Sequence, residues 1–229
     1  MKLAFISDIH ANYDALQAVL AYIRQVEASR IYCCGDIVGY GGQLNECVNA
    51  LRDAGAICVK GNHEEFLLGR RQGERFGGAA GEAIEWQKGI ITKANKQFLG
   101  RLPAALVIGG VSIRMCHGSP SEPEDFIYVL SESATIEAFN SFGEQACVIG
   151  HSHMPVAYRR HVKYRYHEEI LDEVIRIEDG YKYIINVGSV GQPRDGDPRA
   201  CAYIYDTEEK VFVRKRIEYD VAAAQKKIV

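Results

Sequence analysis

Short polar segments containing Asp, Asn and His recur along the chain, each shortly after an apolar run. Imidazole and carboxylate groups together suit Mn, Fe, Co, Ni or Zn better than Ca or Mg. In Asp-x-His and His-x-His segments the two outer side chains leave the same face of an extended backbone, because successive side chains alternate. The segments hold Asp8, His10, Asp36, Asn62, His63, His117, His151 and His153. They predict a metal site, and bound divalent cations can activate water.

Each of these residues, taken alone, would more often have a structural role than bind a metal. A strand-end Asp usually caps a helix or forms a turn, and a lone His is usually a hydrogen-bonded packing residue. Five segments that share one topological position outweigh that interpretation, because chance placement of all five is rare. No Cys stands at ligand spacing in this sequence, so we do not expect a structural zinc site.

The elements that must position these segments alternate between strand and helix. We expect strands at residues 2–7, 30–34 and 56–59, and helices at 14–28 and 44–54 because their apolar residues recur at helical spacing. Asp14 is the expected N-cap of the first helix. This alternation predicts a parallel sheet with right-handed crossovers. Ligands bind at the carboxyl ends of such strands, so the polar segments should meet in one cleft.

The second half of the sequence is richer in strands. Gly109-Gly110 predicts a hairpin between 106–108 and 111–116, and Asp179-Gly180 predicts a turn. Further strands are expected at 147–150, 156–160, 183–187, 201–206 and 211–217, with helices at 133–142 and 222–228. The predicted fold is one α/β domain over residues 1–229, with two sheets facing each other and a mostly helical insert at about 64–101.

Composition narrows the function classes. About half of the 229 residues are hydrophobic (47%), which suffices for a sizeable core, and the formal net charge of −3 gives no basic footprint for polymeric nucleic acid or a membrane surface. No secretory signal or membrane span is expected. The seven Cys lie in apolar surroundings without a C-x-x-C pair, which indicates reduced packing residues and a cytoplasmic location. The sequence does not determine the oligomeric state, and a homo-oligomer is one of the alternatives.

The polar segments resemble the motifs of the calcineurin-like metallophosphoesterases, over the span from Leu3 to Asp206. The segment from Asn186 to Asp195 is similar to a hallmark of the small prokaryotic, phosphodiesterase-like branch. Glu64 and Val187 depart from residues common in that branch, but neither is an expected ligand. The resemblance implies a four-layer α-β-β-α sandwich, in which two facing mixed β-sheets are flanked by helices. It rests on Asp8-x-His10, Gly35-Asp36, Gly61-Asn62-His63-Glu64, His117 and Gly150-His151-Ser152-His153.

The resemblance also implies roles for these residues. Asp8, His10 and His153 would hold one divalent cation, and Asn62, His117 and His151 would hold a second. Asp36 would bridge both, and His63 would face the phosphate and protonate the leaving group, with Asp36 or Glu64 supporting its protonated form. Catalysis would proceed by in-line attack of a metal-bridging hydroxide. Mn is the favoured metal among Mn, Fe, Ni, Co and Zn.

The expected function is hydrolysis of a phosphate ester or anhydride, with a phosphodiesterase favoured. The alternatives are a dinucleoside polyphosphate hydrolase, a serine/threonine-type phosphoprotein phosphatase, and a non-catalytic metal-binding scaffold of the same fold. The expected partner is a small phosphorylated substrate, nucleotide-like in one alternative. Asn62 and His63 are expected to contact it. Arg194 is either a further phosphate contact or part of a surface turn.

Overall fold

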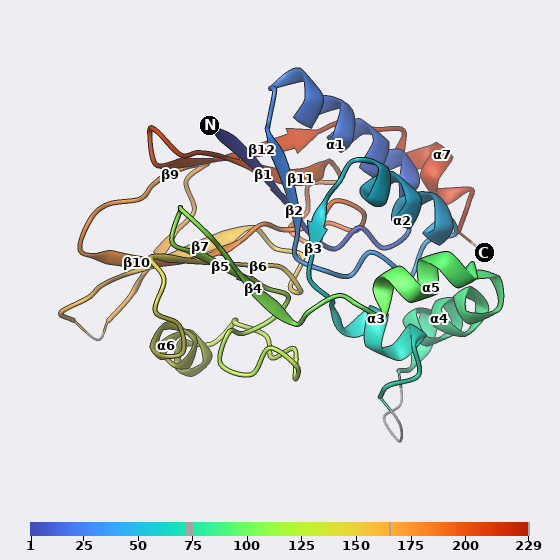
Figure 1. The fold of residues 1–229 in the computed structure, drawn as a ribbon, viewed down its shortest axis with the longest axis horizontal. Coiled ribbons are helices and arrows are strands. Elements are labelled where there is room, and N and C mark those ends of the chain that lie inside the picture. Colours follow the sequence, from blue (N-terminus) through green and yellow to red (C-terminus); the bar gives the residue numbers. More distant parts are fainter. Residues whose placement is uncertain (72–75, 165, 229) are drawn as a thin grey trace.

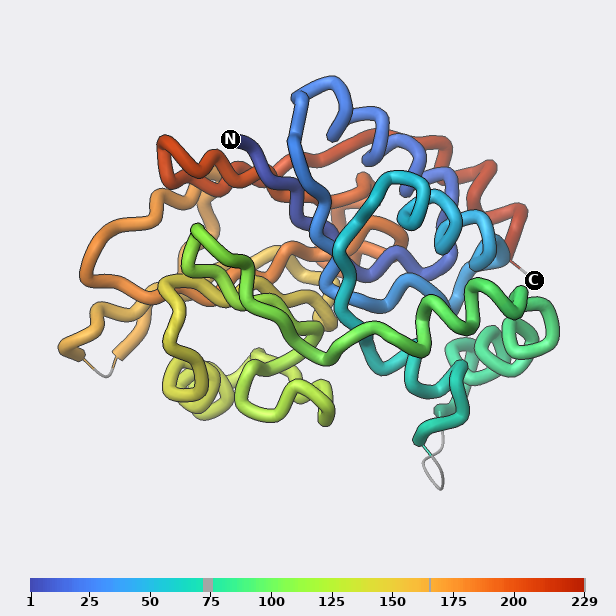
Figure 2. The backbone as a smooth tube through the Cα atoms, in the orientation of Figure 1, coloured from blue at the N-terminus to red at the C-terminus, as the bar shows by residue number. Residues whose placement is uncertain are grey.

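The first six-stranded sheet is built around the N-terminal strand, which is buried except at its first residue. Its blue strands and the red strands from the end of the chain lie side by side in Figure 2, and β1 pairs in parallel with β2 and antiparallel with β11. In spatial order the strands are β3 (Ile57–Cys58), β2 (Arg30–Cys33), β1 (Lys2–Ile6), β11 (Ala200–Asp206), β12 (Val211–Ile217) and β9 (Val174–Arg176).

The second six-stranded sheet comes from the middle of the chain. Its three central strands run parallel, and the strands outside them are antiparallel to their neighbours, so this sheet is also mixed. In spatial order they are β4 (Ala105–Ile108), β5 (Ile113–Cys116), β6 (Ala146–Ile149), β10 (Tyr181–Asn186), β7 (Val156–His161) and β8 (Glu168–Ile170). The computed structural model describes residues 1–71, 76–164 and 166–228.

Helices cover the outer sides of the two sheets (Figure 1). α1 and α2 lie against the first sheet, with α7 beside α1, and α6 lies against the second sheet. α3, α4 and α5 follow one another at the β3 edge. The helices are α1 (Tyr13–Gln25), α2 (Leu44–Asp53), α3 (Asn62–Leu67), α4 (Gly78–Ile90), α5 (Lys93–Leu99), α6 (Glu132–Asn140) and α7 (Val221–Gln225).

Strand alternation assigns each apolar side chain to one layer of the core. In β1, Leu3 and Phe5 point into the core between the sheets, whereas Ala4 and Ile6 point toward α1 and α2. In β10, Ile185 lies between the sheets and Ile184 points toward α6. The three core layers together confirm the predicted four-layer sandwich of two mixed sheets.

Several local predictions need correction. The N-cap of α1 is Asn12, whose side chain accepts from the N–H of Ala15, and not Asp14, which lies inside the first turn. The short edge strands β8 and β9 were not predicted, and β3 contains only two residues. All seven Cys are buried free thiols, as expected. Among the residues that the structure describes, no helix is long and apolar enough to cross a bilayer.

Candidate metal centre

The predicted polar segments lie at the carboxyl ends of strands from both sheets. One group follows β1, β2 and β3 of the first sheet, and the other follows β5 and β6 of the second. Hydrogen bonds join the groups across the sandwich: the N–H of His151 donates to Asp8 Oδ2 (3.0 Å), and His117 Nδ1 lies 2.8 Å from the carbonyl of Cys34. These hydrogen bonds bring the two groups of polar segments together at one site.

A close backbone approach makes this junction possible. A Cβ at Gly150 would collide with the side chains of Ser7 and Asp8 on the neighbouring sheet. Glycine lets β6 end directly against β1. The loops after β1 and β2 are also tied together, because the N–H of His10 donates to the carbonyl of Asp36 (3.0 Å).

Two buried clusters of ligand-type atoms form at the junction. The ligand atoms of Asp8, His10 and His153 lie within 4.8 Å of one another, and so do those of Asp36, His117 and His151. Asp36 connects the clusters. Its Oδ2 lies 3.2 Å from Nε2 of His117 and 3.8 Å from Nε2 of His10.

The histidine tautomers are fixed by backbone carbonyls. Nδ1 of His10 lies 2.9 Å from the carbonyl of Val38, and Nδ1 of His153 lies 2.6 Å from the carbonyl of Gln192. A carbonyl only accepts, so Nδ1 carries the proton and Nε2 of each neutral ring presents a lone pair. These two Nε2 atoms face each other at 3.0 Å. Two lone pairs at this distance repel each other unless a cation lies beside them.

Other ligand-type atoms are buried without partners. Asp8 Oδ1, Asn62 Oδ1 and His117 Nε2 have no hydrogen bond to any described residue. Such groups cost free energy when they are desolvated and unpaired, and metal coordination removes that cost. Oxygen and nitrogen donors of this kind fit a first-row transition metal.

The backbone is strained at five of the candidate ligand residues. Asp8, His10, Asp36, His151 and His153 all have positive φ, between 49° and 69°. Left-handed conformations cost non-glycine residues about 1–3 kcal/mol each and cluster at functional sites. The strain thus coincides with the candidate ligands.

Burial and mutual proximity set the charges of these groups. Burial, and next the neighbouring His63, lower the pKa of His10 well below its usual range, while burial and His117 lower the pKa of His151 to about 3. Burial alone would raise the pKa of Asp36, but His117 and His63 outweigh it and hold that pKa well below its usual range. His10 and His151 are therefore neutral and Asp36 is ionised, which are the forms that bind metals. Burial would lower the pKa of His117, but Asp36 outweighs burial and raises that pKa to about 10, so His117 would release a proton when it binds a cation.

His63 is buried directly beside these two clusters. Its Nε2 is 3.8 Å from Asp36 Oδ2, and its backbone N–H donates to Asp36 Oδ1 (3.0 Å). Burial lowers the pKa of His63, and Asp36 opposes this. The ring also belongs to a third group of ligand-type side chains, with His10 and Asp36.

Glu64 holds the backbone around Asp36 in place, a role that we did not predict from the sequence. Its carboxylate accepts four backbone N–H groups that hold the loop of Asp36 against the start of α3: those of Asp36, Ile37, Val38 and Gly61, at 2.7–3.2 Å. Burial and the nearby Asp36 raise the pKa of Glu64 to about 7, while the N–H groups oppose this shift. Glu64 therefore positions Asp36, and its hydrogen bonds with the described residues come from these backbone N–H groups rather than from the His63 ring.

We expect Glu64→Gln to lower the free energy of unfolding by about 3 kcal/mol or more, because either amide orientation places an NH₂ group against two N–H donors. Chemical denaturation followed by circular dichroism would measure it. Glu85→Gln on the exposed side of α4 is the matched control and should change stability by about 0.5 kcal/mol or less. An equal, small effect of both variants would contradict the assigned role of Glu64.

Arg194 and Tyr40 form part of the rim above the site. Nη2 of Arg194 lies 3.3 Å from the Tyr40 hydroxyl and 2.7 Å from Gln192 Oε1. The Tyr40 ring lies 4.8 Å from the His10 ring and 5.1 Å from the His63 ring. The exposed guanidinium lies over the Tyr40 ring, 5.9 Å from its centroid, and belongs to the predicted surface turn.

Two supporting residues gave no recognisable signal in the sequence. Tyr128 stacks on His151 with ring centroids 3.7 Å apart. The Asn186 amide donates to the carbonyl of Gly150 and to Ser152 Oγ, which fixes the turn that carries His151 and His153. Both contacts join segments that are far apart along the chain, so no local pattern could have indicated them.

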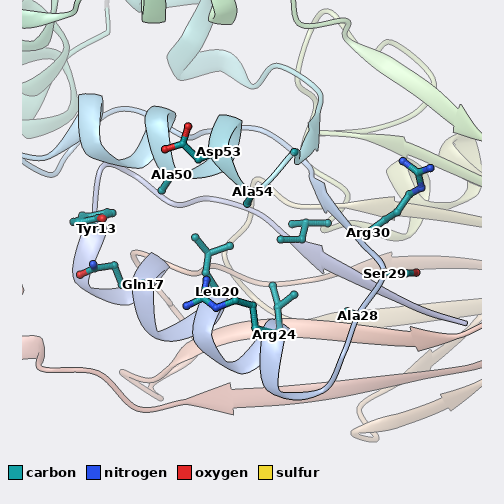
Figure 3. Close-up of a pocket in the computed structure, with 13 residues that line it drawn as sticks. Tyr13, Gln17, Leu20, Arg24, Ala28, Ser29, Arg30, Ala50, Asp53 and Ala54 are labelled. Carbon is teal, nitrogen blue, oxygen red and sulfur yellow. The ribbon is translucent and has the colours of Figure 1, made fainter.

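A separate cavity of about 640 Å³ lies between α1 and α2 (Figure 3). Its lining includes Ser29 and Arg30 at the start of β2 and Gly55 shortly before β3. It therefore lies at the amino ends of these strands, away from the metal ligands at the carboxyl ends.

Comparisons with known proteins agree with the geometry. A family profile described as the calcineurin-like phosphoesterase superfamily domain matches residues 1–210. An uncharacterized protein of Methanocaldococcus jannaschii is 38% identical over 229 residues, which cover 99% of this chain and 91% of that protein.

Two solved structures show the same architecture. The crystal structure of a metallophosphoesterase from Sphaerobacter thermophilus superposes with a TM-score of 0.84 at 34% identity, covering 99% of this chain and 92% of that one. A structure titled as a novel archaeal phosphodiesterase gives a TM-score of 0.52 at 15% identity, with 95% and 100% covered, and is similar in fold alone. With its buried Asp and His clusters, this chain belongs to the calcineurin-like phosphoesterase superfamily.

Proposed function

We propose that this protein is a two-metal phosphodiesterase. The observation that carries the proposal is the pair of buried imidazoles, His10 and His153, whose Nε2 atoms face each other at 3.0 Å beside Asp8 while each Nδ1 is bound to a backbone carbonyl. Asp8, His10 and His153 would hold one cation, Asn62, His117 and His151 a second, and Asp36 both. Two divalent cations would supply Lewis acidity that lowers the pKa of the attacking water and neutralises charge on the phosphoryl oxygens.

The chain's own residues would carry the remaining steps. His63, buried beside Asp36, would donate a proton to the leaving oxygen. Asn62 would contact a phosphoryl oxygen through its amide. Arg194 would bind a further phosphate oxygen from the rim, where it is held by Tyr40 and Gln192.

The proposed role of His63 as a proton donor favours an ester rather than an anhydride as substrate. An alcohol is a poor leaving group and needs protonation as the P–O bond breaks, whereas the phosphate released from an anhydride leaves readily as an anion. This reasoning favours a diester over the dinucleoside polyphosphate alternative. Mn is the favoured metal for the mixed oxygen and nitrogen donors, and the compartment we propose is the cytoplasm.

The test is a substrate panel at fixed Mn²⁺ concentration. It should contain a phosphodiester, a phosphomonoester, a dinucleoside polyphosphate and a phosphopeptide, with Asp36→Asn protein as the control for contaminating activity. We expect the highest kcat/KM on the diester. A higher value on the polyphosphate or the phosphopeptide would favour that alternative, and no turnover with any divalent cation would favour a non-catalytic scaffold.

A further inference from the structure

The turn from Gly39 to Gly41 forms one wall of the site. The Gly39 backbone has φ of +91°, and a Cβ there would collide with Nδ1 and the ring of His63. The next residue, Tyr40, places its ring against both His10 and His63. The turn is thus packed directly against the residue proposed as the proton donor.

Packing contacts, rather than a hydrogen bond at Nδ1, hold the His63 ring. Among the described residues, no atom hydrogen-bonds to His63 Nδ1, although this nitrogen is buried. The ring is confined by His10 (centroids 4.6 Å apart), by the edge-on ring of Phe76 (4.6 Å), and by the turn. A displacement of the turn would therefore allow the imidazole to move.

A single side chain from α4 fixes this turn from outside. Gln87 is fully buried; its Oε1 accepts from the N–H of Gly39 (2.8 Å), and its Nε2 donates to the carbonyl of Gly41 (2.7 Å). The partners are one backbone donor and one backbone acceptor, so the orientation of the amide is determined. The N–H of Gly41 donates in turn to the carbonyl of His10 (3.0 Å), which anchors the other side of the turn.

From these contacts we infer that Gln87 is a positioning residue, through which α4 sets the Gly39–Gly41 turn against His63. This inference rests on the proposed role of His63 as a proton donor. It gives α4 a role in the site, although α4 supplies none of the candidate metal ligands. The chemical consequence is specific: hydrolysis should depend on Gln87 in proportion to how much the leaving group needs a proton.

The experiment compares two diesters that differ only in the leaving group, phenyl methyl phosphate and p-nitrophenyl methyl phosphate. Phenolate is the poorer leaving group and needs protonation more. We expect Gln87→Leu to lower kcat on the phenyl ester about 10-fold or more, since small misplacements of a catalytic group can cost about 10²-fold. On the p-nitrophenyl ester the change should be about 3-fold or less. The metal content should equal that of the wild type.

Further variants separate positioning from general damage. Gln97→Leu makes the same substitution at an exposed position of α5 and should leave both rates unchanged. Gln87→Glu keeps the acceptor for Gly39 but loses the donor to Gly41, so it should show a smaller form of the same selective loss. Gly39→Ala pushes directly on His63 and tests the same displacement if Gln87→Leu does not fold.

A double-mutant cycle gives the decisive readout. In a His63→Ala background, Gln87→Leu should cause no further loss on the phenyl ester, because the group that it positions is already absent. An additive loss in that background, or equal losses on both esters in the His63 protein, would overturn the inference while leaving the proposed function intact. A wild-type protein that hydrolyses neither ester would instead overturn the proposed function, and this inference with it.

Discussion

Asp36→Asn is expected to bind fewer than two Mn²⁺ ions per chain and to lose about 10³-fold or more of its diesterase activity. Oδ2 of Asp36 lies within 3.8 Å of Nε2 of both His10 and His117, so this carboxylate oxygen is shared by the two proposed sites. The amide lacks the negative charge and can present an NH₂ group to the cations. Cations supply several kcal/mol of transition-state stabilisation, and about 4 kcal/mol corresponds to about 10³-fold in rate.

Metal content after dialysis, measured by elemental analysis, would test this expectation together with turnover. Asp53→Asn is the matched control, because Asp53 is exposed at the end of α2 and far from the site. It should retain full metal content and activity. An Asp36→Asn protein that still holds the wild-type number of ions would rule out the bridging assignment.

His63→Ala should lose about 10²–10⁴-fold in kcat on diesters with poor leaving groups, as expected when a general acid is removed. Its metal content should remain that of the wild type. Metal binding should survive because the substitution removes only the His63 ring, whose Nε2 lies 3.8 Å from Asp36 Oδ2. Asp36 stays close to His10 and His117.

Steady-state kinetics and elemental analysis on the same preparation would separate two roles for this residue. His63 also belongs to a group of ligand-type side chains with His10 and Asp36. Loss of metal along with activity would make it a ligand, and full activity would remove it from the mechanism. His161→Ala, at the end of β7 in the second sheet, is the control and should behave as the wild type.

The candidate ligands could be predicted from the sequence because each follows a strand and each is of a metal-binding type. His151 and His153 are two residues apart, and the carboxyl ends of strands meet at one edge, so local rules were sufficient. The junction of the two sheets at Gly150 could not be read in this way. It depends on a contact with Ser7 and Asp8, more than 140 positions away.

Other features escaped prediction for physical reasons. The edge strands Glu168–Ile170 and Val174–Arg176 are only three residues long, too short to show a clear alternation, and pairing with β7 and β12 defines them. Asn12 and Asp14 are both good caps, and only the observed bond to Ala15 distinguishes them. Gln87 appears in the sequence as an ordinary helix residue, and its function arises from packing against a turn 46–48 residues earlier.

The most direct test of the central claim is an anomalous difference map from a crystal grown with Mn²⁺. We expect two peaks per chain, about 3.5–4 Å apart, on either side of Asp36. One should lie against Asp8, His10 and His153, and the other against Asn62, His117 and His151. A single peak, or peaks away from these side chains, would contradict the two-metal assignment.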